Sequence, residues 1–77
     1  MRTIELELGL PIDMPMDKLF NAIGYLSTWN MTYPKVVIYR DNKSPNLMAH
    51  YFKENGDCGY TIGAIWDGTC QKYSLHS

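Results

Sequence analysis

The 77 residues include seven basic and eight acidic side chains, for a formal net charge of −1, and 45% of them are hydrophobic. This length suits a single domain over residues 1–77, and the composition excludes a disordered chain. The balanced charge argues against nucleic-acid binding driven by bulk positive charge, and no apolar run approaches the ~20 residues that cross a bilayer.

The first predicted element is a strand from Arg2 to Leu10. Apolar residues alternate there with polar ones, and the pattern predicts a half-buried strand whose acidic face is solvated. Glu5 and Glu7 share that face. They could bind a metal or act as acid and base, but two exposed neighbours of this kind more often give solubility and edge protection. They also interrupt any signal-peptide apolar region, so we expect a cytoplasmic protein.

A helix is expected next, beginning with Asp13 as its N-cap and ending near Asn30, ahead of Tyr33-Pro34. One apolar stripe is predicted to dock on a sheet; it comprises Met16, Leu19, Phe20, Ile23 and Leu26. A flanking stripe comprises Lys18, Ala22, Tyr25 and Trp29. Tyr25 and Trp29 are expected to cover the margin of the sheet, and the alternative is an aromatic contact site.

Residues 35 to 40 predict a β-branched strand, followed by a polar loop over residues 41–46. If Arg40 faces Leu47 across this loop, Ile38 faces Ala49 on the core side. Val37 and Tyr39 then belong to the opposite, outer face of the sheet.

Two dipeptides, Asn55-Gly56 and Asp67-Gly68, predict two-residue type I′ hairpin turns. The first turn pairs Phe52 with Gly59 and Tyr51 with Tyr60, and the second pairs Trp66 with Thr69. Side chains alternate between faces. The predicted core face holds Leu47, Ala49, Tyr51, Tyr60, Ile62, Ala64, Trp66, Tyr73 and Leu75. The predicted outer face holds Met48, His50, Phe52, Thr61, Gly63, Ile65, Cys70, Lys72 and Ser74.

The element order is thus β-α-β-β-β-β. It predicts an α+β fold in which a four- to five-stranded, mainly antiparallel sheet packs against one amphipathic helix. The first strand either joins one edge or closes the sheet partway into a barrel. The register keeps Cys58 and Cys70 too far apart for a disulfide, so free thiols are expected.

The outer face has two interpretations. Phe52 lies opposite Gly59 and Met48 opposite Gly63 in the predicted register, so both large side chains could simply lean over glycine gaps. The alternative is a binding surface, because exposed Phe, Met and Ile on one patch are typical of contact with another molecule.

No phosphate-binding glycine loop, zinc-ligand spacing or nucleophile motif occurs in the sequence. The predicted register also separates His50 from Cys70 and Cys58 from His76, beyond the reach of a shared metal or a Cys-His pair. We therefore expect a protein that is not an enzyme and that holds no cofactor and no metal.

Two functions remain. The first is protein binding, to another protein or to a second copy as a homodimer, through Tyr39, Met48, His50, Phe52 and Ile65, with Tyr25 and Trp29 at the flank. In size and in its lack of catalytic motifs the chain looks like the small inhibitors that bacteriophages and mobile elements encode against host enzymes, nucleic-acid-directed defence enzymes included.

The alternative is single-stranded nucleic-acid binding, with Tyr39, His50 and Phe52 stacking on bases. The cations then expected at phosphates are Lys35, Arg40, Lys53 and Lys72.

Overall fold

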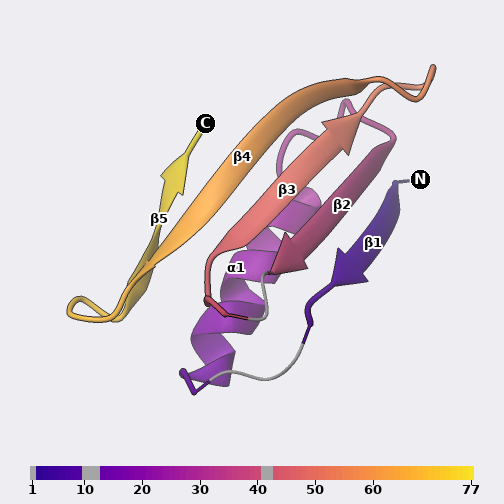
Figure 1. Ribbon diagram of the computed structural model, residues 1–77. Coiled ribbons are helices and arrows are strands. Elements are labelled where there is room, and N and C mark those ends of the chain that lie inside the picture. The colour runs from indigo at the N-terminus through magenta and orange to yellow at the C-terminus, as the bar shows by residue number, and fades with distance from the viewer. Residues whose placement is uncertain (1, 10–12, 41–42) are drawn as a thin grey trace.

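The computed structural model describes residues 2–9, 13–40 and 43–77 and contains one helix and five strands. Their order is β1 (Thr3–Glu7), α1 (Met16–Thr28), β2 (Lys35–Arg40), β3 (Leu47–Phe52), β4 (Cys58–Asp67) and β5 (Lys72–His76). The strands form one open sheet in the order β1-β2-β3-β4-β5, with α1 against one face (Figure 1). The predicted α+β class is confirmed, and the barrel alternative is not.

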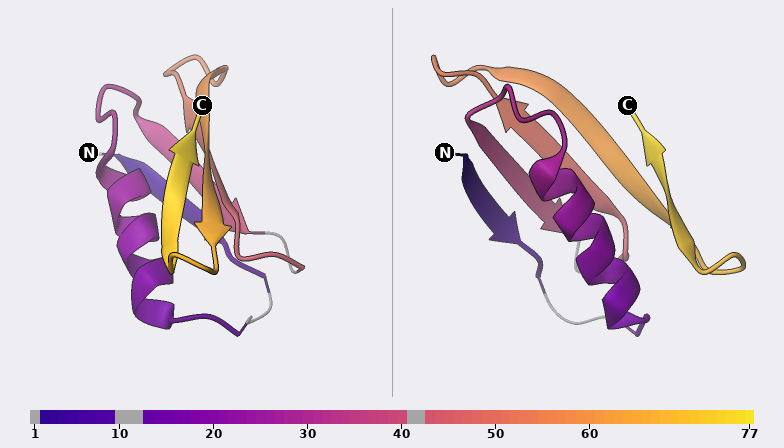
Figure 2. Two further views of the ribbon diagram at one scale, coloured as in Figure 1. Left: turned by 90° about the vertical axis from the view of Figure 1, so that its left-hand side faces the viewer. Right: turned by 180° about the vertical axis from the view of Figure 1, so that it is seen from behind.

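β1 lies at the edge beside β2 and runs parallel to it, whereas the other neighbours are antiparallel. Parallel neighbours need a crossover connection, which α1 supplies. The predicted half-buried strand is wrong, because all five residues of β1 are exposed. Ile4 and Leu6 do share the helix-side face with Val36 and Ile38. However, α1 lies over the middle of the sheet and leaves β1 beside it (Figure 2). Leu10 falls outside the described residues.

The helix begins two residues later than Asp13 as its N-cap would give. Pro15 is its N-cap residue, in extended backbone, and no side chain caps the first turn. Since proline fixes its own φ and lacks an N–H, it suits the boundary, and the Asp13 prediction is wrong. Leu19, Ile23 and Leu26 are buried as expected. By contrast, Met16 and Phe20 are exposed, because they lie on the flank of the stripe that faces away from the sheet's centre.

The β3–β4 hairpin has a three-residue loop and not the predicted two-residue one. The Gly56 N–H donates to the Lys53 carbonyl at 3.0 Å, and the Lys53 N–H donates to the Asp57 carbonyl at 2.8 Å. Gly56 has φ +92° while Asn55 does not enter the left-handed region, so this is a type I turn with a left-handed glycine. A bulge after Tyr51 then pairs Phe52 with Cys58, and the predicted Phe52–Gly59 pair is wrong. Upstream, the predicted pairs of Tyr51, Ala49 and Leu47 with Tyr60, Ile62 and Ala64 are confirmed.

The β4–β5 loop is also longer than predicted. Asp67 pairs with Lys72, leaving a four-residue loop, and the predicted pairing of Trp66 with Thr69 is wrong. The Asp67 carboxylate accepts hydrogen bonds from the Thr69 and Cys70 N–H groups at 2.9 and 3.1 Å. This register differs by four positions from the predicted one. Because four is even, residues of β5 keep their predicted faces. Cys70 instead lies in the loop, and both Cys58 and Cys70 are free and exposed.

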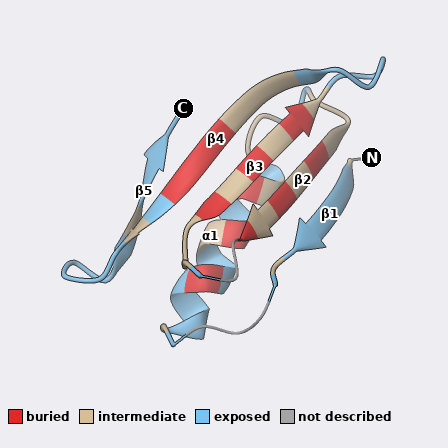
Figure 3. Ribbon diagram, viewed as in Figure 1, coloured by how far each residue is buried: buried red, intermediate tan, exposed pale blue. Residues whose placement is uncertain are grey.

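The core lies between α1 and the middle strands of the sheet (Figure 3). Its buried hydrophobic residues are Leu19, Ile23, Leu26, Val36, Ile38, Leu47, Ala49, Tyr51, Ile62 and Ala64. Of the predicted core face, Tyr60, Trp66 and Tyr73 are only half-buried, and Leu75 is 41% exposed. The core thus thins toward β5. The helix of the described residues is too short and too polar to cross a membrane.

Candidate functional site

The outer face of the sheet has no second layer. No helix or strand of the described residues lies over it, and α1 occupies the opposite side only, as the left view of Figure 2 shows. The predicted pairing of β2 with β3 is confirmed, so Val37 pairs with His50 and Tyr39 with Met48 on this face. Tyr39, Met48, His50 and Phe52 are half-buried there, and Ile65 is exposed. We call Tyr39, Met48, His50, Phe52 and Ile65 the outer-face patch.

Three rings of this patch form a row across β2 and β3. The Tyr39 hydroxyl and His50 Nε2 share a hydrogen bond at 3.1 Å, and their ring centroids are 5.2 Å apart. The His50 and Phe52 centroids are 6.4 Å apart. Lys35 Nζ lies 5.6 Å from the Phe52 centroid and also forms an ion pair with Glu5 at 3.4 Å. The row is therefore held in place on one side by a hydrogen bond and on the other by a paired cation.

The glycine-gap interpretation holds for Met48 and not for Phe52. A Cβ added to Gly63 would lie 3.2 Å from Met48 Sδ, so the thioether occupies the space that this glycine leaves. A Cβ at Gly59 would instead lie 2.5 Å from Tyr33 Cε1. Tyr33 therefore fills the second gap. Phe52 has no glycine to cover, and its position on the open face needs another explanation.

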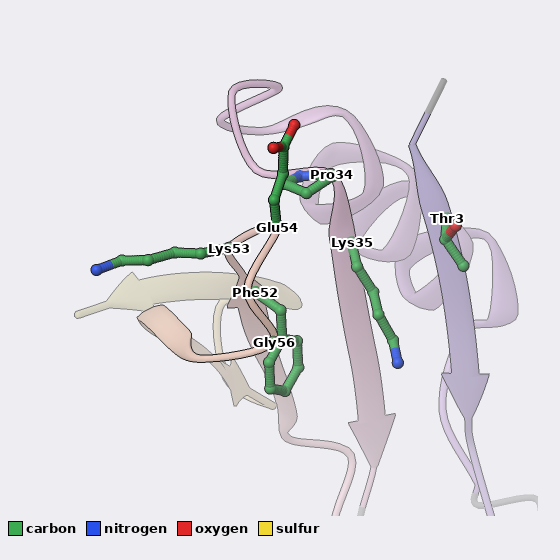
Figure 4. A pocket seen from close by; sticks show the side chains of 7 residues that line it. All are labelled: Thr3, Pro34, Lys35, Phe52, Lys53, Glu54 and Gly56. Atoms are coloured by element: carbon green, nitrogen blue, oxygen red, sulfur yellow. The ribbon is translucent and has the colours of Figure 1, made fainter.

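A shallow pocket of about 390 Å³ opens beside Phe52 at the end of β2 and β3. It is lined by Thr3, Pro34, Lys35, Phe52, Lys53, Glu54 and Gly56. In Figure 4 the side chains of Lys35 and Phe52 extend in the same direction, whereas Lys53 points away from them. An aromatic ring beside a cation can accept a planar, apolar or acidic group.

The two helical members of the predicted site lie elsewhere. Trp29, just after α1, packs against Tyr51 and Tyr60 with centroids 5.2 and 5.1 Å apart. It packs on the helix side against the inner strands β3 and β4. Tyr25 is half exposed on α1. Neither adjoins the outer-face patch, since the sheet lies between them and it.

Sequence reasoning missed Glu5, which forms an ion pair with Lys35 next to Phe52. Lys35 itself lies opposite Phe52, as the predicted pairing of Arg40 with Leu47 implies. The contact with Glu5 depends on β1 lying beside β2, which alternation along a single strand cannot predict. Arg40, by contrast, was expected among the cations at phosphates. It pairs with Leu47 on the helix side, and it is 5% exposed. That role for Arg40 on the outer face is wrong.

The displaced pKa values of the described residues belong to other parts of the fold. Burial raises the pKa of Tyr51 to about 12 and also raises that of Tyr73. In the β4–β5 loop, the hydrogen bond from the Cys70 N–H lowers the pKa of Asp67, and the Asp67 carboxylate raises that of Cys70. None of these four residues is a member of the outer-face patch. No group of three or more His, Cys, Asp or Glu side chains within the described residues could hold a metal ion.

In comparisons with known proteins, no family model, curated protein or solved structure matches this chain.

Proposed function

We propose that this chain is a small, non-catalytic protein-binding module that docks on another protein through the outer-face patch. The observation that carries the proposal is the ring row of Tyr39, His50 and Phe52 on a sheet face that no other element covers. Centres of protein interfaces are enriched in aromatic residues and methionine and depleted of charge. The opposite face, in contrast, already has its partner in α1.

The margin of the patch also suits a protein interface. Lys35 and Glu5 pair with each other beside Phe52, which resembles the polar rim around an apolar centre. The pocket next to Phe52 is large enough to admit one side chain of a partner. We therefore place the strongest contribution to affinity at Phe52.

The test is capture from a host-cell lysate followed by titration of the purified partner. We expect Phe52→Asp to weaken the Kd at least tenfold, since it puts a charge at an apolar centre (about 1.4 kcal/mol or more). Phe20→Asp is the matched control, because Phe20 is an exposed aromatic residue on α1, away from the patch. Equal binding by the parent and Phe52→Asp would refute the proposal. The narrower expectation, an inhibitor of a host enzyme, depends on what the captured partner is.

A second candidate is single-stranded nucleic-acid binding. The position of Lys35 Nζ near the Phe52 ring favours it, because a cation beside a stacking ring suits a nucleotide. Two observations weigh against it: Lys35 is already paired with Glu5, and Arg40 is buried on the other face. A fluorescent oligonucleotide titrated at low and high salt separates the candidates. Tight binding that weakens with salt would support this one, and no binding at low salt would exclude it.

A further inference from the structure

The two edges of the sheet carry complementary side chains. β1 and β5 are each five residues long, and all but Tyr73 of their ten residues are exposed. On the outer face β1 presents Glu5 and Glu7, whereas β5 presents Lys72. On the helix side β1 presents Ile4 and Leu6, which are 46% and 49% exposed, and β5 presents Tyr73 and Leu75. One edge is thus acidic and the other basic, and both are apolar on the same side.

The backbone groups of the two edges match as well. The Thr3 N–H donates to the Pro34 carbonyl, on the β2 side, so the alternate residues Ile4 and Leu6 direct their N–H and C=O groups outward. The Trp66 N–H donates to the Asn46 side chain, on the β3 side. Trp66 therefore does not bond its neighbour Tyr73, and Tyr73 and Leu75 direct their backbone groups to the free edge.

From this match we infer that β1 pairs with β5 of a second copy of this chain, joining the two sheets edge to edge. β5 runs antiparallel to β1 within one sheet, so two copies in the same orientation meet in antiparallel fashion. The register that uses all ten residues places Ile4 opposite Leu75 and Leu6 opposite Tyr73. It also places Glu7 opposite Lys72, an opposite-charge cross-strand pair.

The charges favour this arrangement over a symmetric pairing of two β1 strands. The twofold register that pairs all five residues of β1 would place Glu5 opposite Glu5, and like charges that face each other across strands are destabilising. Pairing β1 with β5 avoids this repulsion. The contact is heterologous, so it either closes into a ring or continues along a filament. It leaves the outer-face patch free, and hence does not depend on the proposed function.

The test is sedimentation velocity of the full chain from roughly 10 μM to roughly 1 mM, because a five-residue strand pair is a small interface and its association should be weak. We expect the parent to associate with increasing concentration. Glu7→Lys and Lys72→Glu should each weaken association roughly tenfold, since each sets like charges opposite one another. An equimolar mixture of the two variants should restore it, because each then offers the other a complementary edge.

Glu54→Lys provides the matched control, since it makes the same charge change in the exposed β3–β4 turn and should associate like the parent. Circular dichroism of every variant verifies the fold. A parent that stays monomeric up to the highest concentration would overturn the inference. So would equal association of both charge-reversal variants and the parent, or failure of their mixture to associate. Association that only Phe52→Asp abolishes would overturn it too, by placing the contact on the outer face.

Discussion

Arg2, just before β1, forms hydrogen bonds with the end of α1 and the loop that follows it. Its guanidinium donates hydrogen bonds to four backbone carbonyls, those of Ser27, Trp29, Asn30 and Tyr33. It also lies 5.4 Å from the centroid of the Tyr51 ring. A helix end leaves its last carbonyls without intrahelical partners, and here one side chain serves them. Nothing in the sequence indicates this role, since the acceptors are 25 to 31 positions away.

We expect Arg2→Met to lower the free energy of unfolding by about 2–3 kcal/mol, because half-buried carbonyls lose a charged donor. Urea denaturation provides the measurement. Lys18→Met, at an exposed position of α1, removes one positive charge without this contact and should change stability by less than about 0.5 kcal/mol. Equal losses in the two variants would contradict the role of Arg2.

The buried hydroxyl of Tyr51 makes stability depend on alkaline pH. It donates to the Leu26 carbonyl at 2.7 Å, and burial raises its pKa from 10.0 to about 12, against a smaller opposing effect of Arg2. The folded state thus favours the protonated phenol. This contribution is fully present below pH 10 and is lost as the pH rises from 10 to about 12, by up to roughly 3 kcal/mol.

Tyr51→Phe should therefore cost about 1 kcal/mol at pH 7, from the lost hydrogen bond, and should flatten the alkaline fall in unfolding free energy. Part of the fall should persist, since burial also raises the pKa of Tyr73. Phe20→Leu, at an exposed site on α1, removes no phenol and should leave the profile close to that of the parent. Denaturant unfolding at a series of pH values gives the profile, and an unchanged slope in Tyr51→Phe would contradict this assignment.

At the scale of the elements, alternation predicted faces better than it predicted loops. An Asn-Gly or Asp-Gly dipeptide indicates a turn, but both dipeptides here also suit longer loops built on a type I turn. The Asp67 carboxylate stabilises the longer β4–β5 loop by accepting hydrogen bonds from two N–H groups, and Gln71, the last residue of this loop, adopts φ 57°. The residues of β5 kept their predicted faces, because the β4–β5 register differs from the predicted one by an even number of residues. The bulge at Phe52 was not predicted because it accompanies the three-residue loop, whereas the sequence had indicated a two-residue turn.

Two glycines should respond oppositely to the same change. A Cβ at Gly59 would lie 2.5 Å from Tyr33 Cε1, so Gly59→Ala forces the ring or the bulge to move and should cost about 1–3 kcal/mol. Gly24 has no atom within 4 Å of such a Cβ and lies inside α1. Gly24→Ala should therefore stabilise the protein by about 0.5–1 kcal/mol. Thermal unfolding of both variants provides the comparison, and a shared sign would contradict the close contact at Gly59.

At the scale of the whole molecule, the fold is a two-layer structure with one face of its sheet left open. The sequence could predict which residues share a face, because side chains alternate along every strand. It could not predict how far α1 extends over the sheet. For that reason Ile4, Leu6 and Leu75 were expected to be buried and are exposed near the two edges. The members of the outer-face patch could be predicted from alternation. The ion pair of Lys35 with Glu5 at its margin could not, because it depends on β1 lying beside β2.

Two neighbouring residues of β4 test whether the two faces differ as described. Ala64 is fully buried beneath α1, while the next residue, Ile65, points to the outer face and is 40% exposed. Ala64→Lys would bury an unpaired charge and should lower the free energy of unfolding by more than about 3 kcal/mol. Ile65→Lys keeps its ammonium in water and should change stability by less than about 1 kcal/mol. Urea denaturation of the pair decides between the faces. A large loss in Ile65→Lys would mean that the outer face is covered within the monomer, and the outer-face patch would then be part of a core and not a surface for a partner.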